Sequence, residues 1–179
     1  MKNLDIDIKV FSEYAVNFIH DINEYNNQQD KEITPFKLQK LLYFVYAYAL
    51  VTWEIKLWND SFEKWSIGPI LPEVFFHYDQ YGNKQIPKTN NEISFFDKLK
   101  TMKRLDLDAL MLEVHQKFTD FELVPIACSE PWKKTPDNAK ISDQDIIDYY
   151  SQNNVNDRLL NEIIYRQSKV NFDFLTQNE

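Results

Sequence analysis

The sequence predicts a mostly α-helical protein, a single globular domain with one small β-strand or hairpin element near residues 57–67. Three observations support this prediction. Apolar residues recur at helical spacing through most of the chain. Several of these segments open with Thr or Ser, or with Pro at the first helical position, as helices often do. The chain has only two glycines, which is too few for a β-rich fold with many tight turns.

The composition indicates a folded, acidic protein. Its 179 residues suit one domain, and 44% hydrophobic and 15% aromatic residues exclude a disordered chain. The net charge of −8 disfavours a nucleic-acid partner, because nucleic-acid phosphates repel an acidic surface. The short basic groups at 98–104 and 133–134 fit solvated helix faces better than a phosphate-binding patch.

Three features predict a cytoplasmic protein without a membrane partner. Cys128 is the only cysteine, which excludes an intramolecular disulfide and fits a reducing compartment. The first residues carry acids where a signal peptide needs an apolar core. The longest apolar run, residues 41–53, is too short to span a bilayer.

Two helices are predicted in the first third of the chain. Residues 8–25 have an amphipathic pattern, and residues 34–53 begin with Thr34 as N-cap and Pro35 at the first helical position. The second helix is apolar on nearly every face, so we expect it to be the central helix. Its polar residues are Lys37, Gln39 and Lys40. They lie near its start, so we expect that end to reach the surface.

The next segment predicts the small β element. Residues 57–67 alternate loosely between apolar and polar side chains, which is typical of a short strand or hairpin. We expect a turn at Gly68–Pro69 and then a short helix over residues 72–81, with Pro72 in its first turn. Residues 83–92 are predicted to be a loop.

Further helices are predicted in the second half. Residues 94–104 and 106–117 have helical spacing. Thr119 and Glu122 form the pattern of a capping box, and Pro125 limits the helix that they begin or lies in its first turn.

The last part of the chain predicts a loop and two helical segments. Residues 129–140 contain two prolines and are expected to be a loop. Ser142 with Asp145 is a capping pattern for a helix that ends near residue 152. We therefore predict a domain over residues 1–152 and a C-terminal helical extension, 153–179, packed on the same domain.

The residues show no signature of catalysis or of cofactor binding. The three histidines, His20, His77 and His115, form no metal-binding pattern at i+3 or i+4. The two glycines lie fourteen residues apart, which fits neither a Rossmann fingerprint nor a P-loop. Cys128 has no nucleophile motif around it and is more typical of a small core residue. We predict no catalytic residue, no metal and no cofactor, and therefore no enzyme. An enzyme that uses His77, His115 or Cys128 is the competing hypothesis.

Trp132 is a candidate for protein binding. It lies in a proline-bounded segment and is followed by Lys133 and Lys134. A Trp with flanking bases fits a protein-binding anchor. A Trp that covers the core from outside fits equally well, and the sequence leaves both interpretations open.

Several segments together resemble one family. They are "TPFKLQKLLYFVYAYAL", then "LWNDSFEKWSIGPILPEVFFHYDQYG", then "EPWKKT" and "ISDQDIIDYY". Their order and spacing over roughly residues 8–151 resemble the Panacea domain of SocA-like antitoxins, also known as phage-associated proteins. The matching residues are Thr34, Leu38, Gln39, Lys40, Leu41, Leu42, Tyr43, Phe62, Trp65, Gly68, Pro69, Pro131 and Trp132. One departure is Ala127–Cys128, where the family commonly has a Thr-His pair.

The resemblance implies a function in toxin neutralisation. Its members look like non-enzymatic antitoxins that bind a cognate protein toxin, here expected from the adjacent gene. An alternative is a phage or mobile-element protein that acts as an adaptor and delivers a partner to a host protease or regulator. The candidate partner-binding residues are Trp65, Gly68, Pro69, Trp132, Lys133 and Lys134.

Overall fold

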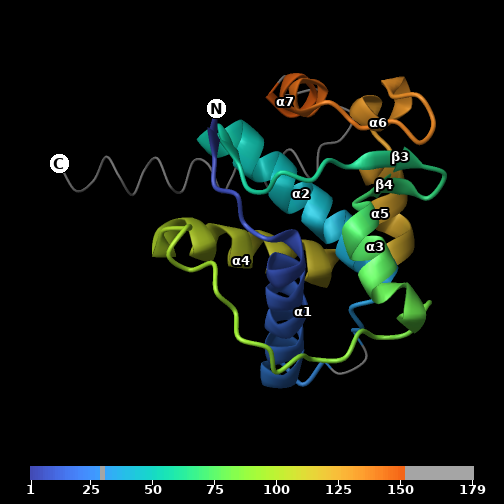
Figure 1. Cartoon of the computed structure of the whole chain (residues 1–179). Helices are drawn as coiled ribbons and strands as arrows, with labels where there is room; N and C mark the ends of the chain where they lie inside the picture. Colours follow the sequence, from blue (N-terminus) through green and yellow to red (C-terminus); the bar gives the residue numbers. More distant parts are fainter. Residues whose placement is uncertain (29–30, 152–179) are drawn as a thin grey trace.

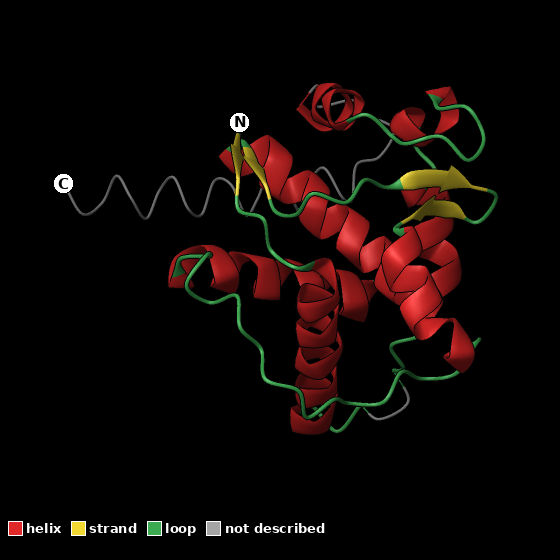
Figure 2. Cartoon of the chain, viewed as in Figure 1, coloured by secondary structure: helices red, strands yellow, loops and turns green. Residues whose placement is uncertain are grey.

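The structure, a computed structural model, describes residues 1–28 and 31–151 and confirms the mostly α-helical fold (Figures 1 and 2). The described residues form seven α-helices, one 3₁₀ helix and two two-stranded sheets. The elements are β1 (Lys2–Asn3), α1 (Ile8–Tyr25), α2 (Pro35–Trp53), β2 (Ile55–Lys56), β3 (Glu63–Trp65), β4 (Gly68–Ile70), α3 (Pro72–Tyr78), η1 (Asp79–Tyr81), α4 (Thr101–Lys117), α5 (Asp120–Ala127), α6 (Glu130–Lys134) and α7 (Asp143–Ser151).

Helix α2 is the centre of the molecule, as its apolar sequence predicts. Pro35 and all residues from Lys37 to Leu50 are buried. The helix contacts α1, α3, α4, α5 and α7 together with β2 and β4. Thr34 caps it by accepting a hydrogen bond from the backbone N–H of Lys37 at 3.1 Å, and Pro35 occupies its first turn. The core is therefore built around α2, which runs between the other helices of the molecule (Figure 1).

Contrary to expectation, the polar side chains near the start of α2 do not reach the surface, although Thr34 and Phe36 beside them are half-buried. Lys37, Gln39 and Lys40 are only 5%, 1% and 0% exposed. Each side chain donates to a backbone carbonyl oxygen of another segment, which lets polar groups lie within the core. Lys37, for example, donates to the carbonyl of His115 at 3.3 Å and lies 3.8 Å from the carboxylate of Asp120.

Helix α1 covers one side of the core, with α4 and α3 against it. Asp7 caps its start by accepting from the backbone N–H groups of Lys9 and Val10. Ahead of it, β1 pairs in parallel with β2, with Lys2 opposite Ile55. The sequence did not predict this pairing, because strands of two residues are too short to show an alternating pattern.

The predicted strand or hairpin near residues 57–67 is a hairpin over residues 63–70, and its turn lies two residues earlier than expected. Strands β3 and β4 are antiparallel, with Trp65 opposite Gly68, so Ser66 and Ile67 form the turn. Gly68 and Pro69 belong to the second strand, and Gly68 has a φ of +110°. The alternation of apolar and polar residues ends at residue 67, before β4 begins, so it predicted only the first strand of the hairpin.

Two other predicted boundaries were wrong. Residues 94–100 form turns and irregular structure in place of a helix, and α4 is one continuous helix over 101–117. Phe95 and Leu99 are buried although their segment is not helical, and their i, i+4 spacing imitated a helix face. Part of the predicted loop 129–140 is the short helix α6, in which Pro131 occupies the first turn.

The capping patterns were better guides. Thr119 and Glu122 form the expected capping box at the start of α5, and Ser142 accepts from the backbone N–H groups of Gln144 and Asp145 before α7. The predicted extension, 153–179, lies outside the described residues, so the boundary near residue 152 stays a prediction.

Candidate protein-binding site

The structure brings the two predicted tryptophans together. The indole N–H of Trp132 on α6 donates to the backbone carbonyl oxygen of Trp65 on β3 at 3.1 Å. The ammonium of Lys64 lies over the Trp132 ring, 4.8 Å from its centroid, and pairs with Asp137 at 3.2 Å. Trp132 therefore fastens α6 to the hairpin while its ring stays partly exposed.

The remaining candidates differ in accessibility. Gly68 and Pro69 are buried within β4, whereas Lys133 and Lys134 are exposed on α6. The structure thus places the glycine and the proline where they shape the hairpin, and the two lysines where a partner could reach them.

Gln39 of α2 holds the junction between the hairpin and α3. Its side-chain oxygen accepts from the backbone N–H of Leu71 at 2.8 Å, and its amide nitrogen donates to the carbonyl of Leu71 at 3.3 Å. Leu71 is the residue before α3 and no side chain caps that helix. One buried amide therefore satisfies both backbone groups at this junction.

Lys40, the next residue, lies beneath Gly68 and Pro69. Its ammonium donates to the carbonyl of Pro69 at 3.4 Å and lies 4.7 Å from the centroid of the Phe36 ring. Burial lowers the pKa of Lys40 to about 8, and the nearby Cys128 thiol opposes that shift. The lysine therefore supports the hairpin from the side of the core, at Gly68 and Pro69.

Cys128 lies in the same cluster. A Cβ atom placed on Gly68 would be 3.3 Å from the Cys128 sulfur. Burial raises the pKa of the thiol, which disfavours the thiolate that a nucleophile needs. Cys128 thus lies beside Gly68 and Lys40.

The hairpin and α3 together carry an exposed apolar surface. Trp65 contacts Phe75 and Phe76, with ring centroids 5.1 and 6.1 Å apart, and Phe76 is 63% exposed. Ile67, at the tip of the hairpin, is 38% exposed. We call Trp65, Ile67, Phe75 and Phe76 the hairpin–α3 face.

A hollow adjoins the hairpin–α3 face. It has a volume of about 220 Å³, and Phe36, Ile67, Ile70 and Phe75 give it mostly apolar walls. An apolar surface beside a cavity is what a partner's anchoring side chain requires. Of the hairpin–α3 face, the sequence predicted only Trp65 as a partner-binding residue and missed Ile67, Phe75 and Phe76. The consecutive pair Phe75–Phe76 was a usable signal, because neighbouring residues point in different directions on a helix that buries only one face, as α3 does.

The histidines do not gather into a site. His115 is buried, with Nε2 3.1 Å from the side-chain oxygen of Asn23, and His77 lies on α3. Within residues 1–28 and 31–151, no group of three or more His, Cys, Asp or Glu side chains is placed to hold a metal ion. None of the helices described there is both long and apolar enough to cross a membrane.

The comparisons with known proteins agree with these features. The family model of the SocA-like antitoxin, Panacea domain, matches residues 38–177, and the chain belongs to this family. The match includes Gln39, Lys40 and the hairpin. It also continues through most of the predicted extension. No curated protein and no solved structure matches the chain.

Proposed function

We propose that this protein is the antitoxin of a toxin–antitoxin pair and neutralises a cognate protein toxin by binding it directly in the cytoplasm. The toxin is expected from the adjacent gene. The chain's membership of the SocA-like antitoxin family supports the general role. The hairpin–α3 face is the single structural observation that carries the binding mode.

The geometry favours binding over catalysis. The side chains of Gln39 and Lys40 on α2 form hydrogen bonds with the backbone of the hairpin and of its junction with α3. They therefore fix the shape of a surface, and they are not aimed at a substrate. A rigid surface loses little entropy when it binds, which favours a tight complex. We propose that the protein has no enzymatic activity of its own.

Co-expression with the adjacent gene product tests this function. The neighbour alone should stop growth, and the wild-type protein should restore it. Phe76→Ser should weaken the complex by about 10-fold or more, because an exposed aromatic at the centre of an interface carries much of the binding energy. The matched control is Tyr25→Ser, which removes an 85% exposed aromatic from the last residue of α1, away from the hairpin (Figure 1).

The outcomes separate the alternatives. Equal rescue by both variants would contradict the hairpin–α3 face as the binding site. Failure of wild-type protein to rescue would contradict the antitoxin function. Rescue that depends on a host protease, with a falling toxin level, would identify an adaptor that delivers the toxin for degradation.

A further inference from the structure

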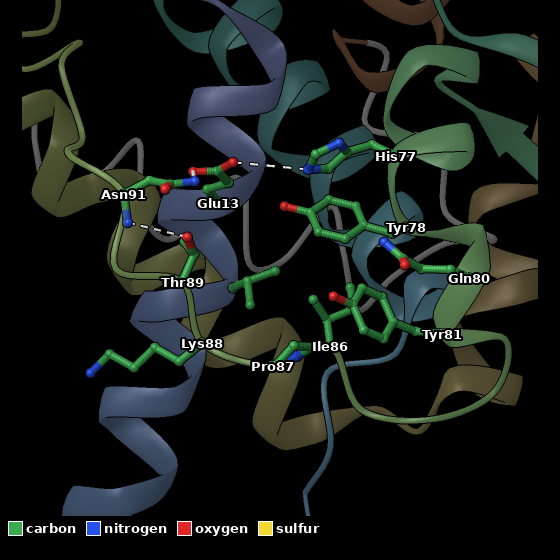
Figure 3. Close-up of a pocket in the computed structure, with 11 residues that line it drawn as sticks. Glu13, His77, Tyr78, Gln80, Tyr81, Ile86, Pro87, Lys88, Thr89 and Asn91 are labelled. Atoms are coloured by element: carbon green, nitrogen blue, oxygen red, sulfur yellow. Dashed lines mark hydrogen bonds and ion pairs between the residues drawn. The ribbon is translucent and has the colours of Figure 1, made fainter.

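A second cavity lies on a different part of the molecule, between α1, the α3–η1 segment and residues 86–91 (Figure 3). Its volume is about 270 Å³. It shares no lining residue with the hollow beside the hairpin–α3 face, although α3 contributes to both. Its size is just below the roughly 300–1,000 Å³ of pockets for drug-sized ligands, so it suits one side chain or a small molecule.

Glu13 of α1 supplies the negative charge of this cavity. Its side chain is 15% exposed. One carboxylate oxygen accepts from the side-chain amide of Asn91 at 3.0 Å, and the other lies 3.9 Å from Nε2 of His77 (Figure 3). Within the described part of the chain, no Lys or Arg forms an ion pair with Glu13. A poorly solvated carboxylate without a full counter-charge favours the arrival of a cation.

Aromatic rings form another wall of the cavity. The ring centroids of Tyr78 and Tyr81 lie 6.4 Å apart, and the His77 ring meets Tyr78 edge-on at 4.6 Å. Burial raises the pKa of Tyr78 to about 12, and the charge of Glu13 acts in the same direction. Tyr78 therefore stays a neutral phenol near pH 7. Tyr78 is only 5% exposed, whereas Tyr81 is half-buried and is the more accessible of the two rings. The face of a tyrosine ring attracts a cation within about 6 Å.

The lysine among the lining residues does not fill this position. The ammonium of Lys88 pairs with Asp21 of α1, and Figure 3 shows the side chain extending away from Glu13 and the two tyrosines. The cavity thus combines a partly buried carboxylate and tyrosine rings with no resident cation from the described residues.

We propose that this cavity binds an ammonium or guanidinium group on a flexible stem, and that the stem is a Lys or Arg side chain of the partner toxin. The second half of this proposal rests on the proposed function, and the first half does not. Glu13 neutralises the cation while Tyr78 and Tyr81 hold the stem and the charged head. A free small cation with the same head group is the alternative source.

An NMR titration of the full chain tests the cavity itself. The probe is N-acetyl-arginine methylamide, and its neutral isostere N-acetyl-citrulline methylamide is the matched ligand control. The arginine compound should give saturable shifts in the backbone amides of residues 77–81, 86 and 88–91. Glu13→Gln, which keeps an acceptor for Asn91, should weaken this binding about 10-fold or more.

The matched protein control is Glu24→Gln, which removes the same charge from an exposed position three turns further along α1. It should leave the titration unchanged, and both variants should keep the wild-type spectrum. Absence of saturable shifts, equal shifts with the citrulline compound, or equal affinity in Glu13→Gln would overturn the cavity as a cation site.

A second measurement identifies the source of the cation. Glu13→Gln should weaken the complex with the adjacent gene product about 10-fold or more, whereas Glu24→Gln should not. If the arginine compound binds but Glu13→Gln leaves that complex unchanged, the partner's side chain is excluded and a free cation is the ligand. If wild-type protein does not bind the gene product at all, the proposed function fails, and the titration still decides the cavity.

Discussion

Gly68 meets two constraints that no other residue type satisfies. Its φ of +110° lies where side chains are strained, and a Cβ atom there would be 2.8 Å from the Lys40 ammonium nitrogen and 3.3 Å from the Cys128 sulfur. Gly82 also has a positive φ, of +55°, but a Cβ atom there would meet nothing within 4 Å. Substitution of Gly82 therefore introduces backbone strain alone, whereas substitution of Gly68 introduces backbone strain and a steric clash.

We predict that Gly68→Ala destabilises the protein more than Gly82→Ala. The backbone strain should cost about 1–3 kcal/mol at each position, and only Gly68→Ala must also displace Lys40. Urea unfolding of both variants measures the difference. Equal losses would mean that the lysine moves aside freely and that Gly68 is needed only for its backbone.

His115 predicts how stability depends on pH. Burial lowers its pKa from 6.5 to about 3, with help from the charges of Lys37 and Lys31, so the folded protein holds it neutral. The unfolded chain protonates this histidine below pH 6.5 and so binds more protons. Its stabilising contribution is complete above pH 6.5 and falls between pH 6.5 and 3, by up to about 1.4 kcal/mol for each pH unit.

His115→Gln should flatten that part of the pH profile, because an amide can still donate to Asn23 and does not titrate. The measurement is the free energy of unfolding at several pH values between 3 and 7, for both proteins. Carboxylates contribute to both profiles alike, so the difference isolates the histidine. Identical slopes in the two proteins would contradict the assignment.

At the scale of elements, one side chain links α2 to the hairpin and α3. Gln39→Ala leaves the backbone N–H of Leu71 without its buried partner, whereas the carbonyl of Leu71 still accepts from the backbone N–H of Phe75 at 2.9 Å. One unpaired buried group costs about 1–3 kcal/mol, so we expect a loss of about 1–3 kcal/mol in the free energy of unfolding. The control is Gln116→Ala on the exposed side of α4, which should change it by less than about 0.5 kcal/mol. Similar losses in both variants would show that Gln39 does not hold the junction.

The sequence predicted elements well wherever a local signal defines them. Thr34 with Pro35, and Thr119 with Glu122, mark helix starts through side-chain hydrogen bonds that depend only on neighbouring residues. Phe95 and Leu99 misled the prediction, because burial in an irregular segment gave a helix-like spacing. Tertiary contacts, and not local signals, decide such segments.

The candidate site was predictable only in part, for the same reason. Trp65 and Trp132 stood out as single residues, and the structure joins them by a hydrogen bond between distant segments. Lys40 looked like a surface lysine because its partner, the carbonyl of Pro69, belongs to another element. Glu13 gave no signal at all, since its neighbours His77 and Asn91 come from parts of the chain far from α1 in sequence.

At the scale of the whole molecule, one continuous core connects the candidate site to the remaining helices. Its buried residues extend from Ile6 before α1 to Tyr150 in α7, and α2 contacts both the hairpin strand β4 and the distant α4. An element that separates from α2 exposes apolar surface both on itself and on α2. Local unfolding of the hairpin should therefore cost almost as much free energy as global unfolding.

We predict that the described part of the chain unfolds in one cooperative transition. The measurement is a urea titration followed by ¹H–¹⁵N spectra, which report each residue separately. Native amide signals from α1, α4 and the β3–β4 hairpin should disappear at the same urea concentration, because all three depend on α2. Hairpin and α6 signals that disappear first would reveal a separate, weaker unit. The hairpin–α3 face would then be a surface that orders when it binds, and a rigid complex would no longer follow from the fold.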